Sequence, residues 1–126
     1  MKSSSEEEIV KAVKETLKRF NKNPHSLKGY QQQAKTFITE KANNFDYLVL
    51  GLCEEAGETA GKFAKGIRDG NFNHEEVKKE LGDVLWFVAM ISDKLGFTLE
   101  DVAKSNLEKL ERRKARNVIN GNGDNR

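Results

Sequence analysis

Two pairs of carboxylates in this chain have the residue types and the spacing of a metal-binding site. Glu55 and Glu58 lie three positions apart in the segment GLCEEAGETAGKF, and Glu80 and Asp83 repeat that spacing in ELGD. Residues three apart are neighbours on a helix surface, so each pair would present its carboxylates together. Carboxylate oxygens are hard ligands, which Mg²⁺ and Mn²⁺ prefer. If the two helices pack side by side, these residues predict a divalent-cation site.

The segment around the first pair contains features that cost helix stability. Glu54 adds a third carboxylate within five positions, and glycine costs about 1 kcal/mol relative to alanine in a helix interior. At about 100° per residue, Gly57 and Gly61 share one small apolar side with Cys53 and several alanines. We expect this side to admit a second helix closely, with Cys53 as a core residue. The cation would offset the repulsion between the carboxylates.

The second pair favours a cation over the alternative, which is a solvated face on which Glu58 pairs with Lys62. Glu80 projects into the edge of the apolar stripe expected for its helix, and Asp83 follows three residues on. The expected stripe consists of Val77, Leu81, Val84, Leu85, Val88 and Ile91. An ionised carboxylate beside a core is costly unless a cation or hydrogen bonds compensate it. We therefore expect a cation between the two helices.

Helical periodicity and capping residues predict five helices and no strand. Three helices start at capping-box spacings, which are Ser5 with Glu8, Asn73 with Glu76, and Thr98 with Asp101. The expected helices are the segment from Ser5 to Asn23-Pro24, residues 27–41, a helix from an N-cap at Asp46 to about Lys65, the segment from Asn73 to Gly96, and residues 99–116, with a loop at 66–73. This pattern predicts a single all-α domain, a four- to five-helix bundle, with an irregular tail at 117–126.

Composition limits the classes of partner and location. Hydrophobic residues make up 37% and charged residues 33% of the 126 residues, and the net charge of +2 favours neither a polyanion nor a membrane as partner. The single cysteine excludes an internal disulfide and fits a reducing compartment. The acidic N-terminus is unlike a signal peptide, and the longest apolar run, 85–91, is too short to span a bilayer. We expect a soluble cytoplasmic protein.

The last expected helix is strongly basic toward its end. Its expected core face consists of Leu99, Val102, Ala103, Leu107 and Leu110, and Asn106 lies inside that arc, where it is either a buried, satisfied amide or a ligand-binding group. Lys109 and Arg113 belong to a cluster of five cations between 109 and 116. Such a cluster either stabilises the negative end of the helix dipole or holds phosphates. Metal-binding carboxylates opposite Lys and Arg are typical of phosphoryl-transfer sites.

Both acidic motifs resemble a known signature. EEAGE at 54–58 and ELGD at 80–83 resemble the EExxE and ExxD motifs of the MazG-like all-α nucleoside triphosphate pyrophosphohydrolases. The similarity extends over YLVLGLCEEAGETAGKFAKGIRDG, KKELGDVLWFVAMISDKLGFTLEDVAKSNLEKLERRKAR and the final GDNR. It covers roughly residue 28 to the end, which leaves 1–25 as an N-terminal helical extension.

The resemblance implies an enzyme that uses Mg²⁺, or Mn²⁺ in its place, to cleave a nucleoside triphosphate into a monophosphate and pyrophosphate, as in nucleotide-pool housecleaning. Family members are usually homodimers or homotetramers. By motif position, the metal ligands are Glu55, Glu58, Glu80 and Asp83, the catalytic residues are Glu54 and Glu55, and the substrate-binding residues are Lys62, Asn106, Lys109 and Arg113. Glu54 either contacts the metal ligands without binding the metal itself or activates water. Trp86 and Phe87 are candidates for base stacking.

Other classes of function fit the sequence less well. A di-iron bundle needs Glu-x-x-His pairs, and neither His25 nor His74 follows a glutamate by three residues. A nucleic-acid-binding or purely interacting helical module remains the alternative, although acidic pairs beside the basic helix would repel phosphates in the absence of metal. Apolar residues on more than one side of several helices also predict a homo-oligomer.

Overall fold

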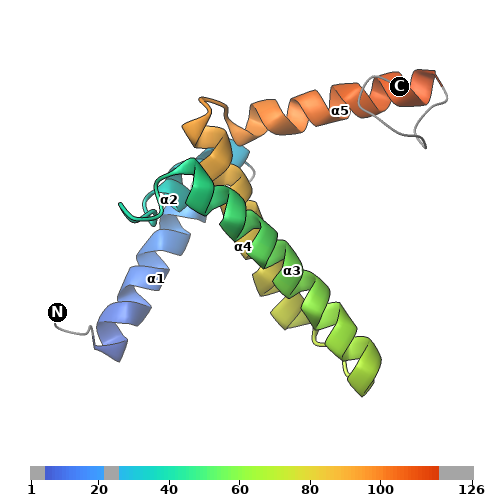
Figure 1. The fold of residues 1–126 in the computed structure, drawn as a ribbon. Helices are drawn as coiled ribbons and strands as arrows, with labels where there is room; N and C mark the ends of the chain where they lie inside the picture. The colour runs from blue at the N-terminus through green and yellow to red at the C-terminus, as the bar shows by residue number, and fades with distance from the viewer. Residues whose placement is uncertain (1–4, 22–25, 117–126) are drawn as a thin grey trace.

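The computed structural model describes residues 5–21 and 26–116, and these residues form helices and connecting turns without a strand (Figure 1). The helices are α1 (Glu6–Asn21), α2 (Leu27–Lys35), α3 (Phe45–Asp69), α4 (His74–Lys94) and α5 (Leu99–Ala115). The predicted all-α class is therefore confirmed. The expected stop at Asn23-Pro24 and the expected tail at 117–126 lie outside the described residues.

The three predicted capping boxes all mark helix starts. The Ser5 hydroxyl accepts a hydrogen bond from the Glu8 amide, and the Glu8 carboxylate accepts one from the Ser5 amide, each at 3.3 Å. Thr98 and Asp101 form the same reciprocal pair at the start of α5. Asn73 caps α4 through its side-chain oxygen, which accepts from the amides of Glu75 and Glu76. These local signals fix where the helices begin.

Several helix boundaries differ from the prediction. Helix α2 ends at Lys35 rather than at 41, because Thr36 caps it and donates its hydroxyl to the Gln33 carbonyl at 2.7 Å. The N-cap of α3 is Asn44 rather than Asp46, and its side chain accepts from the Tyr47 amide at 2.8 Å.

Helix α3 also continues past the predicted end near Lys65, so residues 66–69 are helical and only 70–73 form the loop. The helix ends where Gly70 adopts a positive φ of 67°, a conformation that glycine accepts at low cost. Gly66 serves packing instead of ending the helix, since a Cβ there would come within 2.8 Å of the Phe72 ring.

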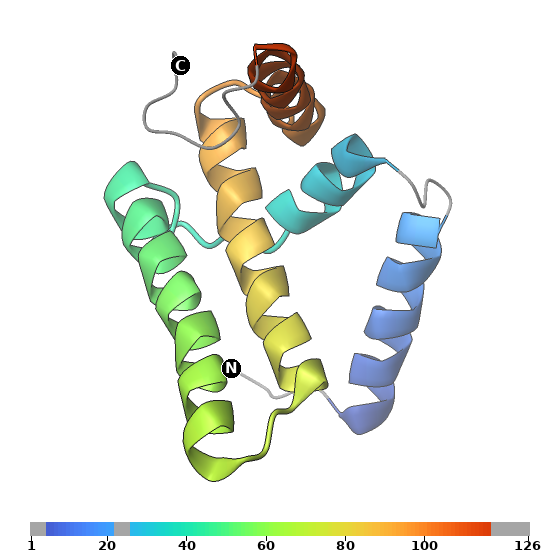
Figure 2. The same cartoon turned by 90° about the vertical axis from the view of Figure 1, so that its right-hand side faces the viewer.

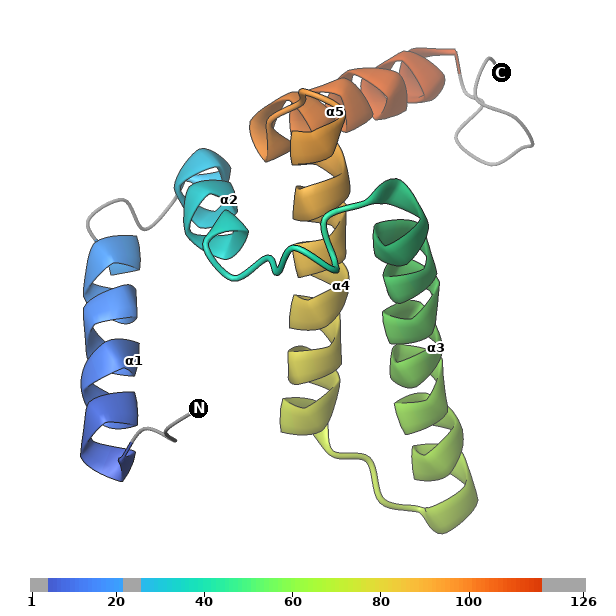
Figure 3. The same cartoon turned by 60° about the vertical axis from the view of Figure 1, so that its left-hand side comes forward.

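Helices α3 and α4 form an antiparallel hairpin (Figures 1 and 3), and this hairpin carries all the acidic residues predicted for the site. Helix α2 contacts α4, and Figure 3 shows it on the opposite side of α4 from α3. Helix α1 contacts only α2 among the described helices and stands apart from the hairpin in Figure 2. Helix α5 leaves the C-terminal end of α4 and contacts α2 and α4 but not α3.

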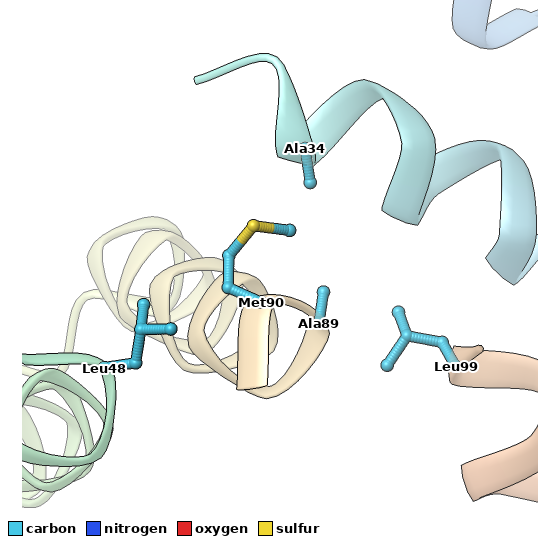
Figure 4. Close-up of a cluster of buried hydrophobic side chains, with 5 residues drawn as sticks. All are labelled: Ala34, Leu48, Ala89, Met90 and Leu99. Atoms are coloured by element: carbon cyan, nitrogen blue, oxygen red, sulfur yellow. The ribbon is translucent and has the colours of Figure 1, made fainter. Parts of the chain in front are cut away.

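The hydrophobic core is small and lies near the C-terminal end of α4. Its buried residues come from four helices and are Ala34, Leu48, Ala89, Met90 and Leu99 (Figure 4). Only Leu48 and Met90 are large side chains that are fully buried in the described residues. The core therefore joins the helices at one end and leaves much of their length uncovered.

Several predicted core positions are exposed instead. Leu81 and Leu85 of α4 are 53% and 40% exposed, and Val102, Leu107 and Leu110 of α5 are exposed as well. The prediction was wrong at these positions because none of the described helices covers those faces. Cys53 is also exposed, and nothing lies within 4 Å of a Cβ built at Gly57 or Gly61. The small apolar side of α3 thus does not face α4.

Gln31 is the polar link between three helices. This buried side chain donates to the carbonyls of Ala89 at 3.2 Å and Phe97 at 3.1 Å, and it accepts from the Leu99 amide at 3.1 Å. It thereby ties α2 to α4 and to the first residue of α5. A buried polar group that loses its partners costs about 1–3 kcal/mol. Gln31 therefore sets the corner at which α5 departs.

Replacing Gln31 with leucine should lower the free energy of unfolding by about 2–4 kcal/mol, because the Phe97 carbonyl and the Leu99 amide would lose their partner. Urea unfolding followed by circular dichroism measures this. Gln32→Leu is the matched control, since Gln32 is exposed on the same helix, and its effect should stay within about 0.5 kcal/mol. Equal stability of both variants would show that the link contributes nothing.

Candidate metal centre

Three of the four predicted metal ligands converge between α3 and α4. Glu55 of α3 and Glu80 and Asp83 of α4 each offer one carboxylate oxygen, and these oxygens all lie within 4.8 Å of one another. Glu55 and Glu80 are half-buried, and Asp83 is exposed. Glu58, the fourth predicted ligand, is exposed and lies outside this cluster. The acidic cluster, defined as Glu55, Glu80 and Asp83, joins the two helices of the hairpin.

The electrostatics of the acidic cluster show how strongly its charges oppose one another. Burial, a hydrogen bond with the Glu80 side chain, and the negative charges of Asp83, Glu80 and Glu54 raise the pKa of Glu55 from 4.5 to about 7. The first of these causes is the largest. Without a cation, a proton on Glu55 relieves the repulsion between the carboxylates. The donor set therefore fits a hard divalent cation, which would take the place of that proton.

A pocket of ≈ 290 Å³ opens beside the acidic cluster. It is lined by Tyr47, Leu50, Gly51, Glu54, Glu55 and Phe87. The rings of Tyr47 and Phe87 lie 6.4 Å apart between centroids, and Trp86 meets Phe87 edge to face at 5.0 Å. This pocket places predicted catalytic Glu54, which is exposed, next to two aromatic rings.

The close approach of the hairpin helices occurs at Gly51, which the sequence analysis did not single out. A Cβ at Gly51 would overlap the ring of Phe87, whereas Cβ atoms at Gly57 and Gly61 would meet nothing. Gly51 lies one turn before Glu54 and Glu55. Gly51 and the Phe87 ring, which pack against each other, therefore also form part of the wall of the pocket. Its place in an otherwise apolar stretch was the only available signal.

Lys62 pairs with a different residue from the one considered in the sequence analysis. Its ammonium lies 3.4 Å from the Glu76 carboxylate of α4, not against Glu58. Lys62 is half-buried and crosslinks the hairpin toward its loop end. The structure therefore does not contain the Glu58–Lys62 pair that was the alternative to a cation site, and Lys62 is anchored to α4.

The predicted substrate-binding residues of α5 lie in a separate place. Asn106 and Lys109 line a groove of ≈ 440 Å³ with Phe97, Asp101, Val102 and Ser105. Asn106 is exposed, so its interpretation as a buried amide was wrong, and Arg113 is buried. The groove shares no residue with the pocket beside Glu55. Asp83 precedes the end of α4 by about 16 Å of helix, and α5 starts beyond that end.

Comparison with known proteins identifies the family. Residues 43–118 match the MazG nucleotide pyrophosphohydrolase domain. The chain belongs to the MazG family. It is 41% identical over 92 residues to the Gene 37 protein of Mycobacterium phage L5. The matched segment covers 69% of this chain and 81% of that protein. No solved structure matches the chain.

The family match contains α3, α4 and α5, and so it contains all the predicted site residues. The predicted resemblance is confirmed, and family membership supports a nucleotide pyrophosphohydrolase enzyme. Helices α1 and α2 lie outside the match. Among the described helices, none is long and apolar enough to cross a membrane.

The raised pKa of Glu55 predicts how the stability of the metal-free protein depends on pH. Because the folded state binds this proton more tightly than the unfolded chain, the contribution of Glu55 to stability is present below pH 4.5 and is lost as pH rises toward about 7. Urea unfolding across this range should show that loss in the parent protein but not in Glu55→Gln. Parallel pH profiles for the two proteins would contradict the assignment.

Proposed function

We propose that this protein hydrolyses nucleoside triphosphates to nucleoside monophosphates and pyrophosphate with Mg²⁺, and that Mn²⁺ can replace Mg²⁺. The observation that carries the proposal is the convergence of Glu55, Glu80 and Asp83 from two helices of the segment that matches the family. Such an activity suits removal of unwanted nucleotides from the cellular pool. Turnover of a panel of nucleotides would identify the base and the sugar of the substrate.

The acidic cluster would hold the metal, with Glu58 on the next turn of α3 as a fourth carboxylate. When bound, Mg²⁺ supplies positive charge that neutralises the phosphates and helps to position them. Glu54 lines the pocket and would take the proton of the water that attacks the α-phosphorus. As the new P–O bond forms, the bond to the bridging oxygen breaks, and that oxygen leaves with pyrophosphate.

The pocket beside Glu55 is the proposed place of the nucleoside. Tyr47 and Phe87 provide two aromatic faces there, and stacking of a base on an aromatic ring contributes about 1–3 kcal/mol. Trp86 serves a different purpose, because its indole N–H donates to the Ala34 carbonyl at 3.0 Å and so fastens α2 to α4. Phe87 is therefore the stronger of the two base-stacking candidates from the sequence.

The direct test is incubation with a panel of ribo-, deoxyribo- and modified nucleoside triphosphates and Mg²⁺, followed by ³¹P NMR. The proposal expects a monophosphate and pyrophosphate from at least one nucleotide. Release of inorganic phosphate and a diphosphate would place the cleavage at the wrong bond. No turnover of any nucleotide would favour the alternative of a non-enzymatic nucleotide-binding or interaction module.

Glu80→Gln keeps the shape of a predicted ligand and removes its charge. The variant should lose most turnover and most of the stabilisation that Mg²⁺ gives the parent protein, because bound ligand stabilises the folded state by mass action. Its metal-free melting temperature should equal or exceed that of the parent, since one crowded charge is gone. Activity assays and thermal melts with and without Mg²⁺ measure these effects.

Glu40→Gln is the matched control, because Glu40 is an exposed carboxylate in the turn between α2 and α3. It should leave turnover and both melting temperatures unchanged. A loss of metal-free stability in Glu80→Gln with activity retained would make Glu80 a structural residue instead.

A homo-oligomer would account for two features of the single chain. Leu81 and Leu85 of α4 and Leu107 of α5 are exposed, and such apolar faces are typically covered by a partner. The basic helix α5 does not reach α3 in its own chain. We propose that a second copy covers these faces and brings Asn106 and Lys109 to the acidic cluster of its neighbour.

Coexpression of two inactive variants tests this arrangement. Glu80→Gln and Lys109→Ala should each be nearly inactive alone, whereas coexpression should restore about a quarter of the parental activity, because half the dimers are mixed and one of their two sites is intact. Light scattering gives the mass of each sample. A monomeric mass, or a mixture no more active than its components, would contradict the shared site.

A further inference from the structure

Helix α1 lies outside the segment that matches the family, and one side of it carries apolar residues that the described helices leave uncovered. Val10, Val13 and Leu17 share this side and are 43%, 52% and 54% exposed. Among the described helices, α1 contacts only α2. An exposed row of large apolar side chains is typical of a surface that binds a partner.

Helix α5 carries a second uncovered stripe with the same spacing. Leu107 and Leu110 are 63% and 38% exposed, and half-buried Ala103 lies one turn before Leu107. Both stripes advance by alternating steps of three and four residues, which are the steps of two helices that pair through a 3.5-residue apolar repeat. Each stripe also continues to a charged residue one turn away, which is Glu6 at the start of α1 and Lys114 near the end of α5.

The two stripes match along their whole length when the helices run antiparallel. The residues that then lie opposite one another are Leu17 and Ala103, Val13 and Leu107, Val10 and Leu110, and Glu6 and Lys114. A parallel alignment would instead place Glu6 and Lys114 at opposite ends, each beside an apolar residue. The antiparallel alignment also puts the positive end of the α1 dipole beside the negative end of the α5 dipole. Helices of 16 and 17 residues are long enough for this pairing.

Two observations favour the α5 helix of a second copy as the partner of α1. Within one chain α1 and α5 make no contact, and Figure 3 shows them extending in different directions. A lipid surface suits α1 less well, because the helix carries four carboxylates and four cations, whereas helices that bind anionic lipid are rich in cations.

We propose that α1 of one copy packs antiparallel along α5 of a second copy, with Val13 against Leu107 and Glu6 paired with Lys114. The contact gives an interaction to a helix that lies outside the family match. Lys109 lies about 160° around α5 from Leu107, so α1 would not cover that predicted substrate-binding residue. The contact does not rest on the proposed function, since it requires neither a metal nor a nucleotide.

Disulfide crosslinking of the full chain tests the contact directly, in a background in which Cys53 is replaced by serine. After mild oxidation, the double variant Val13→Cys/Leu107→Cys should form a covalent dimer in which mass spectrometry finds the two positions linked between chains. Val13→Cys/Glu108→Cys is the matched control, since Glu108 lies on another side of α5. It should crosslink about 10-fold more slowly, because a disulfide requires Cβ atoms about 3.5–4.5 Å apart. A link within one chain, or equal crosslinking of both variants, would overturn the proposal.

Charge reversal tests the same contact without added cysteines, through the Kd of self-association measured by sedimentation equilibrium. Glu6→Lys and Lys114→Glu should each raise this Kd by about 5-fold, because each places like charges opposite one another at two symmetry-related contacts. The double variant restores opposite charges and should return the Kd close to the parental value. Glu15→Lys, on the opposite side of α1, is the control and should leave the Kd unchanged.

Unchanged Kd values in both single variants, or additive weakening in the double variant, would overturn the contact. A parent protein that stays monomeric would overturn it as well. None of these results bears on the proposed hydrolysis, which nucleotide turnover measures separately.

Discussion

The crowding of Glu55, Glu80 and Asp83 between two helices is the constraint on which the rest of the structure depends. Three carboxylate oxygens within 4.8 Å of one another repel strongly, and a half-buried setting offers little water to screen them. Burial, and after it the hydrogen bond with Glu80 and this repulsion, raise the pKa of Glu55 to about 7, and a proton on Glu55 relieves part of the repulsion. A divalent cation would relieve more of it and would turn a destabilising feature into a binding site.

The scaffold has to keep these charges together against their repulsion. The α3–α4 hairpin does so with a tight reversal between Gly70 and Asn73, an ion pair between Lys62 and Glu76, and the packing of Phe87 on Gly51. The buried core lies at one end of the hairpin only. This division leaves long apolar faces of the described helices uncovered, and these faces are the reason for proposing an assembly of copies.

Much of the fold could be predicted because its signals are local. Capping residues such as Ser5, Asn73 and Thr98 act within one turn, and the i, i+3 spacing of Glu80 and Asp83 puts them on one face in any helix. The short loop between two long helices favours an antiparallel hairpin, which is the arrangement that the structure shows. These features depend little on tertiary context.

The remaining features depend on how each helix is rotated against its neighbour, which periodicity alone does not determine. Helix α3 has small or apolar residues on more than one side, so Gly57 and Gly61 were as plausible a contact as Gly51. The partner of Lys62 and the exposure of Leu81 follow from that rotation. The direction of α5 depends on Gln31, a residue 68 positions away from its partner Leu99.

A crystal structure of the protein with Mn²⁺ and a non-hydrolysable nucleoside triphosphate would test the central claim most directly. The account predicts an anomalous Mn²⁺ peak bonded to oxygens of Glu55, Glu80 and Asp83 at about 2.1 Å, as for Mg²⁺. It also predicts that the triphosphate contacts the same ion. A Mn²⁺ peak elsewhere, with the three carboxylates unoccupied and the nucleotide bound away from them, would contradict it.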